Sequence, residues 1–266
     1  MRFFLLLLPI FIFAKTVAVS IAPQKWIIEQ IAPDVEVAVM IPQAASPVTY
    51  TPKPSDLAAL QKSEIYFTIG VPFEKANLKR FASLNPKMKF IDMNRYVRRF
   101  PIADHHEHEH DHESLDPHTW LAPPQLMLLA RAALQELVKL KPTKKAAYVQ
   151  NYEKLVHKLA AFDAAIYAKL KGQKFLVYHP SFGYFARVYD LEQIAIEKEG
   201  KEPSAAHLTH LLHEAKGAKV LIIEPQFPKR SAQLLAKKLG LMIVTIDPLA
   251  PNPLKTIKKL ADALRR

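Results

Sequence analysis

The stretch from Thr143 to Leu170 reads TKKAAYVQNYEKLVHKLAAFDAAIYAKL and contains neither glycine nor proline. Its large apolar side chains recur every three or four residues, at Tyr148, Tyr152, Leu155, Leu159, Phe162, Ile166 and Leu170. That spacing places them on one face of a helix. At 1.5 Å per residue the helix would be about 40 Å long, which exceeds the needs of one small domain. We therefore predict one long helix that joins two lobes.

Short apolar runs alternate with amphipathic segments on both sides of this helix. Before it, we expect strands at 16–20, 35–41, 65–69 and 89–92, and helices at 24–32, 55–62 and 124–140. After it, we expect strands at 175–178, 220–223 and 242–246, and helices at 182–188, 204–215, 231–239 and 254–264. Such alternation is typical of parallel sheets built from strand–helix units. The predicted fold is α/β, with an N-terminal lobe (15–142), a linking helix (143–171) and a C-terminal lobe (172–266).

Length and composition agree with two globular domains. The chain has 266 residues, half of them hydrophobic, which is enough apolar material for two cores. Its formal net charge is +12, but the basic residues are scattered and form no long run with interleaved aromatic residues. We therefore expect a solvated basic surface and no nucleic-acid partner. The absence of cysteine excludes disulfides, thiolate metal sites and a cysteine nucleophile.

The first fourteen residues are expected to be a signal peptide. Arg2 supplies a positive charge, residues 3–13 are almost all apolar, and Ala14 is a small residue at a plausible cleavage point. The apolar run of about 11 residues is too short to cross a bilayer. A buried first strand or an uncleaved anchor is the alternative. The expected location of the protein is the periplasm.

Five of the eleven histidines fall in one tract, residues 104–113, which alternates imidazoles with carboxylates and has no apolar side chain. These histidines are His105, His106, His108, His110 and His112. Imidazole is a good ligand for zinc, copper and nickel, so the tract predicts metal contact. A polar loop without such a role is the alternative.

Four further polar residues stand where a strand or an ordered turn ends. His179 follows the strand at 175–178, Glu224 the strand at 220–223, and Asp247 the strand at 242–246. His118 lies in a stiff turn between Pro117 and Trp120. Ligands of open α/β sheets bind beyond the carboxyl ends of strands, so these side chains could converge in a cleft between the lobes. Two imidazoles and a carboxylate would make a zinc site from His118, His179 and Asp247, with Glu224 as a ligand or as a group orienting a histidine.

Other candidate metal-binding or catalytic motifs are weaker or missing. His207, His210 and His213 recur every three residues on one expected helix, which we interpret as a polar face rather than a metal stripe. The sequence has no glycine-rich phosphate loop, no nucleophile elbow and no H-E-x-x-H helix. We therefore expect a binding protein and no enzyme.

At these residues the sequence resembles the zinc-uptake (ZnuA-like) solute-binding proteins of ABC importers, within the wider group of zinc and manganese binding proteins and adhesins. The matching motifs come in the family's order: 46–56, 116–121, 179–185, 202–204, 224–227 and 247–249. A histidine-rich loop before the second motif is typical of the zinc branch. The resemblance implies two Rossmann-like lobes joined by one long helix, with the metal held between them. It assigns ligand roles to His118 and His179, and a fourth-ligand role to Asp247.

One position departs from the family pattern. The first motif normally carries a histidine ligand where this chain has Val48, and valine has no donor atom. Three explanations stay open: water completes the site, a histidine of the tract enters it, or the site has lost high affinity.

Three functions follow from these observations. The first is a periplasmic receptor that binds Zn²⁺ and delivers it to an ABC permease, as a monomer and without catalysis. The second is a manganese or iron receptor, or an adhesin, of the same architecture. Harder ions favour carboxylate ligands, so the histidines argue for zinc. The third is an exported zinc hydrolase, in which the position left open at Val48 would hold an activated water.

Overall fold

The fold is taken from a computed structural model, which describes residues 15–102, 115–170, 172–197, 204–227 and 230–265. The expected signal peptide and the histidine tract lie outside these ranges. In the part of the chain that is described, none of the helices combines the length and the apolar character that a membrane crossing requires.

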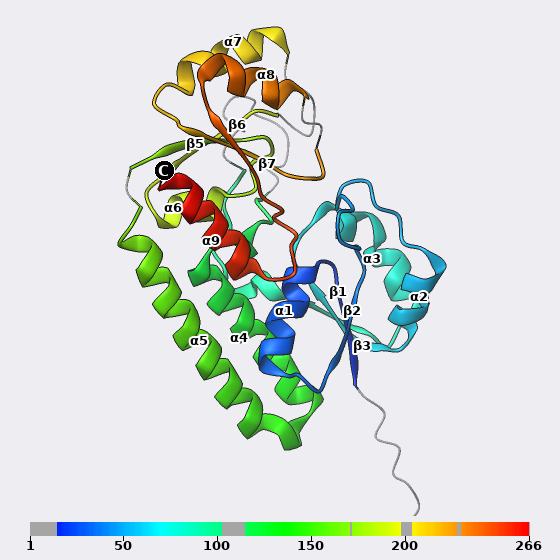
Figure 1. The fold of residues 1–266 in the computed structure, drawn as a ribbon. Helices are drawn as coiled ribbons and strands as arrows, with labels where there is room; N and C mark the ends of the chain where they lie inside the picture. Colours follow the sequence, from blue (N-terminus) through cyan, green and yellow to red (C-terminus); the bar gives the residue numbers. More distant parts are fainter. Residues whose placement is uncertain (1–14, 103–114, 171, 198–203, 228–229, 266) are drawn as a thin grey trace, which may run out of the picture.

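Two four-stranded parallel sheets form the centres of two lobes (Figure 1). The first has the order β2-β1-β3-β4, with β1 (Thr16–Val19), β2 (Glu36–Val39), β3 (Ser63–Thr68) and β4 (Lys89–Asp92). The second has the order β6-β5-β7-β8, with β5 (Lys174–Val177), β6 (Glu192–Ala195), β7 (Val220–Ile223) and β8 (Met242–Thr245). The two sheets therefore repeat one topology, and the predicted α/β class with parallel sheets is confirmed.

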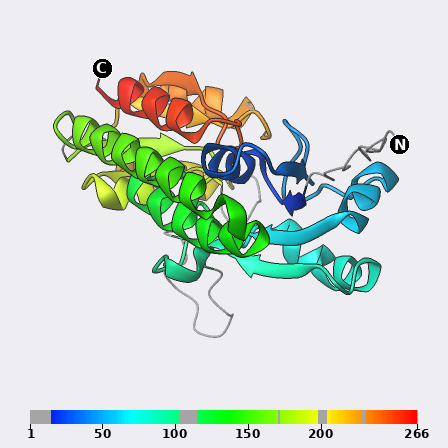
Figure 2. The same ribbon diagram turned by 90° about the horizontal axis from the view of Figure 1, so that it is seen from below.

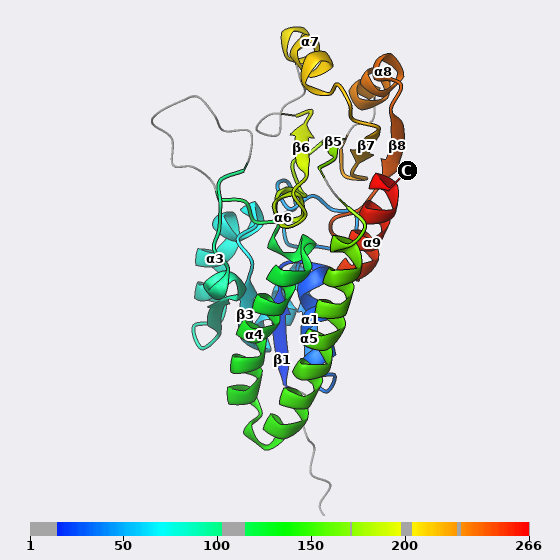
Figure 3. The same ribbon diagram turned by 90° about the vertical axis from the view of Figure 1, so that its left-hand side faces the viewer.

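The first sheet is covered on both faces. Helices α2 (Pro54–Gln61) and α3 (Pro72–Leu84) lie on one side, and α1 (Ala22–Ile31) and α4 (Pro123–Leu140) lie on the other (Figures 1 and 3). Helix α3 was not predicted, although Phe73, Leu78 and Phe81 follow a helical spacing. Short 3-10 turns, η1 (Met93–Tyr96), η2 (Thr119–Leu121) and η3 (Pro142–Lys144), connect these elements.

The long helix is present as α5, from Lys145 to Tyr167, and is 23 residues long. It is shorter than the predicted range because Pro142–Lys144 form the separate turn η3 and the last residues before Leu170 leave the helix. Helices α4 and α5 lie side by side along much of their length (Figure 2). The two lobes joined by a long helix are confirmed, while the exact domain boundaries stay a prediction.

One hydrophobic core runs through both lobes. In β5, Phe175 and Val177 face this shared core, which also includes side chains of α6 (Gly183–Val188) and α9 (Pro253–Leu264). The alternate residue Leu176 faces a smaller cluster beneath α7 (Ala205–Glu214) and α8 (Arg230–Leu239). Because the core is continuous between the lobes, a wide hinge motion would expose apolar surface.

Candidate metal centre

The carboxyl ends of the strands in both sheets open onto one cavity between the lobes. Its volume is about 230 Å³. Residues that directly follow β3, β5, β7 and β8 line it, among them Gly70, His179, Gln226 and Pro248. Parallel sheets of one topology place their strand ends at such a crevice, so the cavity is where the fold favours a ligand.

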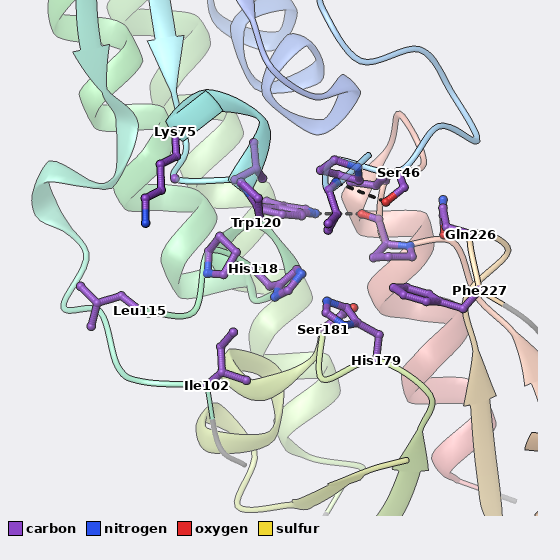
Figure 4. A pocket seen from close by; sticks show the side chains of 18 residues that line it. Ser46, Lys75, Ile102, Leu115, His118, Trp120, His179, Ser181, Gln226 and Phe227 are labelled. Carbon is purple, nitrogen blue, oxygen red and sulfur yellow. Dashed lines mark hydrogen bonds between the residues drawn. The ribbon is translucent and has the colours of Figure 1, made fainter. Parts of the chain in front are cut away.

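His118 and His179 come together in this cavity, as the sequence predicted. Their ring centroids are 5.2 Å apart, and the rings meet edge to face (Figure 4). His118 comes from the turn that begins η2 in the N-terminal lobe, and His179 comes from the end of β5 in the C-terminal lobe. The two imidazoles therefore bridge the lobes.

Each imidazole is oriented by a buried carboxylate. Nδ1 of His118 lies 2.7 Å from Oδ1 of Asp116, and Nδ1 of His179 lies 2.5 Å from Oε1 of Glu197. A carboxylate at Nδ1 favours the tautomer whose Nε2 lone pair is free, which is the form that ligates a metal. Burial lowers the pKa of His179, against the hydrogen bond with Glu197 that raises it, and the neighbouring His118 adds to the lowering.

Asp116 is itself held between the lobes. Its Oδ1 accepts the backbone N–H of His118 at 2.9 Å, and its carbonyl oxygen accepts the hydroxyl of Tyr184 at 3.3 Å. The start of α6 approaches it closely: a Cβ on Gly183 would lie 2.8 Å from Oδ2 of Asp116. A glycine is therefore needed at 183 for the two lobes to meet here.

Trp120 lines the cavity and connects the two lobes there. Trp120 is 1% exposed, and its Nε1 donates a 2.8 Å hydrogen bond to the carbonyl oxygen of Pro248 in the other lobe. Phe227 stacks on His179 with ring centroids 4.9 Å apart. Trp120 lies against His118 with ring centroids 5.3 Å apart, so aromatic side chains from both lobes pack against the two imidazoles.

Asp247 does not join the two histidines. Its Oδ1 accepts hydrogen bonds from Nε2 of Gln226 at 2.8 Å and from the backbone N–H of Leu249 at 2.9 Å. It is not among the residues that line the cavity. Among the described residues, no group of three or more His, Asp or Glu side chains could hold an ion together. A ligand role for Asp247 stays a prediction and would require its side chain to turn toward the cavity, which it does not line.

Glu224 lies beneath His179 and outside the cavity lining. Its side chain is fully buried, and its Oε2 accepts the backbone N–H of His179 at 3.3 Å. The described residues offer no hydrogen-bond partner to Oε1 of Glu224 or Oε2 of Glu197. Burial raises the pKa of Glu224 to about 8, and the neighbouring carboxylate of Glu197 adds to the rise, against hydrogen bonds that lower it. The expected role as a support for a histidine fits this position better than a ligand role.

Glu224 should make the stability of the metal-free protein depend on pH. Its ordinary pKa is 4.5 and its folded pKa is about 8, so the folded chain binds the extra proton between these values. Stability should then fall as the pH rises through that window. We expect Glu224→Gln to match the wild type at pH 5 and to melt roughly 5 °C or more above it at pH 9. Thermal unfolding in chelator at both pH values checks this; equal melting curves at pH 9 would contradict it.

The histidines of α7 do not line the cavity. His210 lies on α7 with its Nδ1 3.5 Å from Glu214, and His213 on the same helix is exposed, as expected of a polar face. The tract histidines His105, His106, His108, His110 and His112 lie outside the described residues. The nearest described residues on either side, Ile102 and Leu115, both line the cavity.

Val48 lines the cavity from the loop between β2 and α2, and 66% of it is exposed. Glu197, by contrast, was missed. It follows the strand residues Ile194–Ala195 and Ile196, so the strand-end rule that selected His179 applies to it as well. The polar start of β6, Glu192 and Gln193, hid that strand.

Comparisons with known proteins agree with this architecture. The family described as "Zinc-uptake complex component A periplasmic" matches residues 17–266. The high-affinity zinc uptake system protein ZnuA of Bacillus subtilis is 30% identical over 227 residues, covering 77% of this chain and 69% of that protein. A crystal structure of ZnuA superimposes with a TM-score of 0.87 and 35% identity, covering 95% of this chain and 100% of the other.

The zinc-binding lipoprotein AdcA of Streptococcus pneumoniae (strain TIGR4) is 28% identical over 236 residues. The match covers 83% of this chain and 47% of that protein, so the chain spans about half the length of this relative.

Proposed function

This chain belongs to the family of periplasmic zinc-uptake components, and from that premise we propose that it captures Zn²⁺ outside the cytoplasm and delivers it to an ABC importer. The observation that carries the proposal is the pair His118 and His179, whose rings meet across the lobes with carboxylates at both Nδ1 atoms. Neutral imidazoles with free Nε2 atoms are zinc ligands.

The proposed mechanism is ligand exchange without chemistry. The histidine tract, tethered at Ile102 and Leu115, would collect the ion at the cavity mouth. His118 and His179 would then hold it, and Asp247 would add a carboxylate if its side chain turned. Release would come from local loop movement, because the continuous core and the Trp120 hydrogen bond to Pro248 oppose hinge opening.

Zinc is favoured over manganese by the donors that meet in the cavity. Two imidazoles suit zinc, whereas manganese prefers carboxylate and carbonyl oxygen. We expect calorimetric titration to show zinc binding that a hundredfold excess of Mn²⁺ reduces by less than about twofold. Full displacement of zinc by that excess would favour the manganese alternative.

The hydrolase alternative gains no support from the site. A hydrolase would need a general base beside the bound water, and Glu224 is fully buried beneath His179 and does not line the cavity. It therefore has no contact with a water molecule bound there.

The carboxylates behind the histidines should contribute to zinc affinity. Removing such a partner loosens the ring and lowers its basicity, so Asp116→Ala and Glu197→Ala should each weaken zinc binding by about 10–100-fold. Glu192→Ala is the matched control. Glu192 begins β6, the strand that Glu197 follows, but its carboxylate pairs with Lys174 at the surface. Competition with a fluorescent zinc chelator measures all three. Affinities equal to that of the control would exclude an orienting role.

A further inference from the structure

The cavity is larger and more apolar than a bare ion needs. Its volume of about 230 Å³ is several times the roughly 30 Å³ that a water molecule occupies in the liquid. Most of its wall is apolar, with side chains of Val48, Ile102, Leu115, Trp120, Phe227 and Leu249. Walls of this kind, with a few polar groups, are typical of sites for small organic molecules.

The described residues supply too few ligands for a zinc ion alone. Zinc prefers four ligands, and only the two imidazoles of His118 and His179 meet in the cavity. Val48 offers no donor, and Asp247 is bound to Gln226 and Leu249. About two coordination positions are therefore left for groups that are not described side chains.

Lys75 adds a positive charge to this incomplete site. It stands near the start of α3 and lines the same cavity on the His118 side (Figure 4). Among the described residues, no carboxylate lies within ion-pair distance of its ammonium group. Its side chain is exposed at the cavity, where a ligand that carries negative charge would find an opposite charge to pair with.

We propose that the cavity takes zinc as a complex with a small amino-carboxylate chelator, which fills the ion's open positions while its carboxylate pairs with Lys75. This rests on the proposed zinc function and names the form in which the ion is bound. An amino acid such as L-histidine has the required parts. Its amino and imidazole nitrogens complete a tetrahedral site with the imidazoles of His118 and His179, and its carboxylate stays free for Lys75.

The apolar walls then have a role that a bare ion would not give them. Val48 occupies the side of the cavity where a further protein ligand would otherwise stand, and it contacts the organic part of the chelator instead. Phe227 and Trp120 present ring faces and edges to the same space. Burial of the chelator against these residues adds apolar contact to the two coordinate bonds and one ion pair.

Native mass spectrometry tests this directly on the chain with His105, His106, His108, His110 and His112 replaced by alanine, so that zinc on the tract adds no mass, with Zn²⁺ alone, L-histidine alone, and both at equal concentration. With both present we expect one added mass equal to one zinc plus one histidine. L-histidine alone should add nothing, and His118→Ala with His179→Ala should lose the joint mass. In titrations of the zinc-loaded protein, Lys75→Ala should bind L-histidine about two- to fivefold more weakly, as for one ion pair at an exposed site.

Two variants control the charge. Lys75→Arg should keep the affinity for L-histidine, and Lys79→Ala, an exposed lysine one turn further along α3 and outside the cavity lining, should leave it unchanged. A zinc-loaded protein that never retains L-histidine would overturn the proposal, as would a Lys75→Ala variant that binds it like the wild type. Both results would leave the zinc function standing. Absence of zinc binding with and without L-histidine would instead remove the proposed function itself.

Discussion

Zinc binding in the cavity is expected to disappear when His118 and His179 are both replaced by alanine. These are the only two imidazoles that line the cavity among the described residues, and each is already oriented by a carboxylate. Because loss of a ligand's hydrogen-bond partner alone costs about 10–100-fold, loss of both ligands should cost more than about a thousandfold. Isothermal titration calorimetry should therefore lose one zinc site.

The experiment is sharpest in a background that removes the tract. With His105, His106, His108, His110 and His112 replaced by alanine, the heat of zinc binding that remains can be assigned to the cavity. His210→Ala with His213→Ala removes the same number of imidazoles from exposed positions on α7 and should keep the site. If the cavity variant retains the stoichiometry and affinity of this control, the two histidines are not the ligands.

Replacing Val48 with histidine is expected to strengthen zinc binding by about one to two orders of magnitude, the scale of one added imidazole ligand. Val48 lines the cavity and is largely exposed, so a larger ring can be placed there without disturbing a core. Its backbone N–H is held by Oγ of Ser46 at 3.2 Å, which positions the loop beside the site.

Val48→Ala controls for the change of shape, since it adds no donor, and it should bind zinc like the wild type. Competition with a fluorescent chelator gives both affinities. If the histidine variant folds normally and binds zinc no better than the alanine variant, position 48 does not face the ion. The added ligand should also lower retention of L-histidine, because it takes one of the positions assigned to the chelator.

The periodicity of apolar residues predicted the elements well wherever one face of a helix or strand is continuously buried. The long helix and most strands were placed within a few residues because their apolar faces are continuous. Strand β6 was missed because Glu192 and Gln193 interrupt its apolar run at an edge of the sheet, and α3 was missed where charged residues surround its few apolar ones. The spacing of apolar residues reflects which side chains are buried, so helices and strands that are half exposed are hard to recognise from it.

The site was predictable only in part, for a geometric reason. The strand end before His179 and the stiff turn at His118 indicated two residues that the structure brings together, since parallel topology opens strand ends onto one crevice. Their role as metal ligands stays a prediction. The same rule could not separate a residue that faces the cavity from one that turns aside: Glu224 lies under His179, and Asp247 binds Gln226 and Leu249. Asp116 pairs with His118 two residues away, and Glu197 reaches His179 because β6 lies beside β5 in the sheet. The position of Lys75 at the cavity depends on how the two lobes meet. No single stretch of sequence records that arrangement.

The central claim is that His118 and His179 hold the ion between the lobes. X-ray diffraction from crystals grown with zinc, recorded on both sides of the zinc absorption edge, tests it most directly. The account predicts an anomalous peak at about 2.0–2.1 Å from Nε2 of both His118 and His179. A fully occupied zinc peak elsewhere, with none between these two rings, would contradict it.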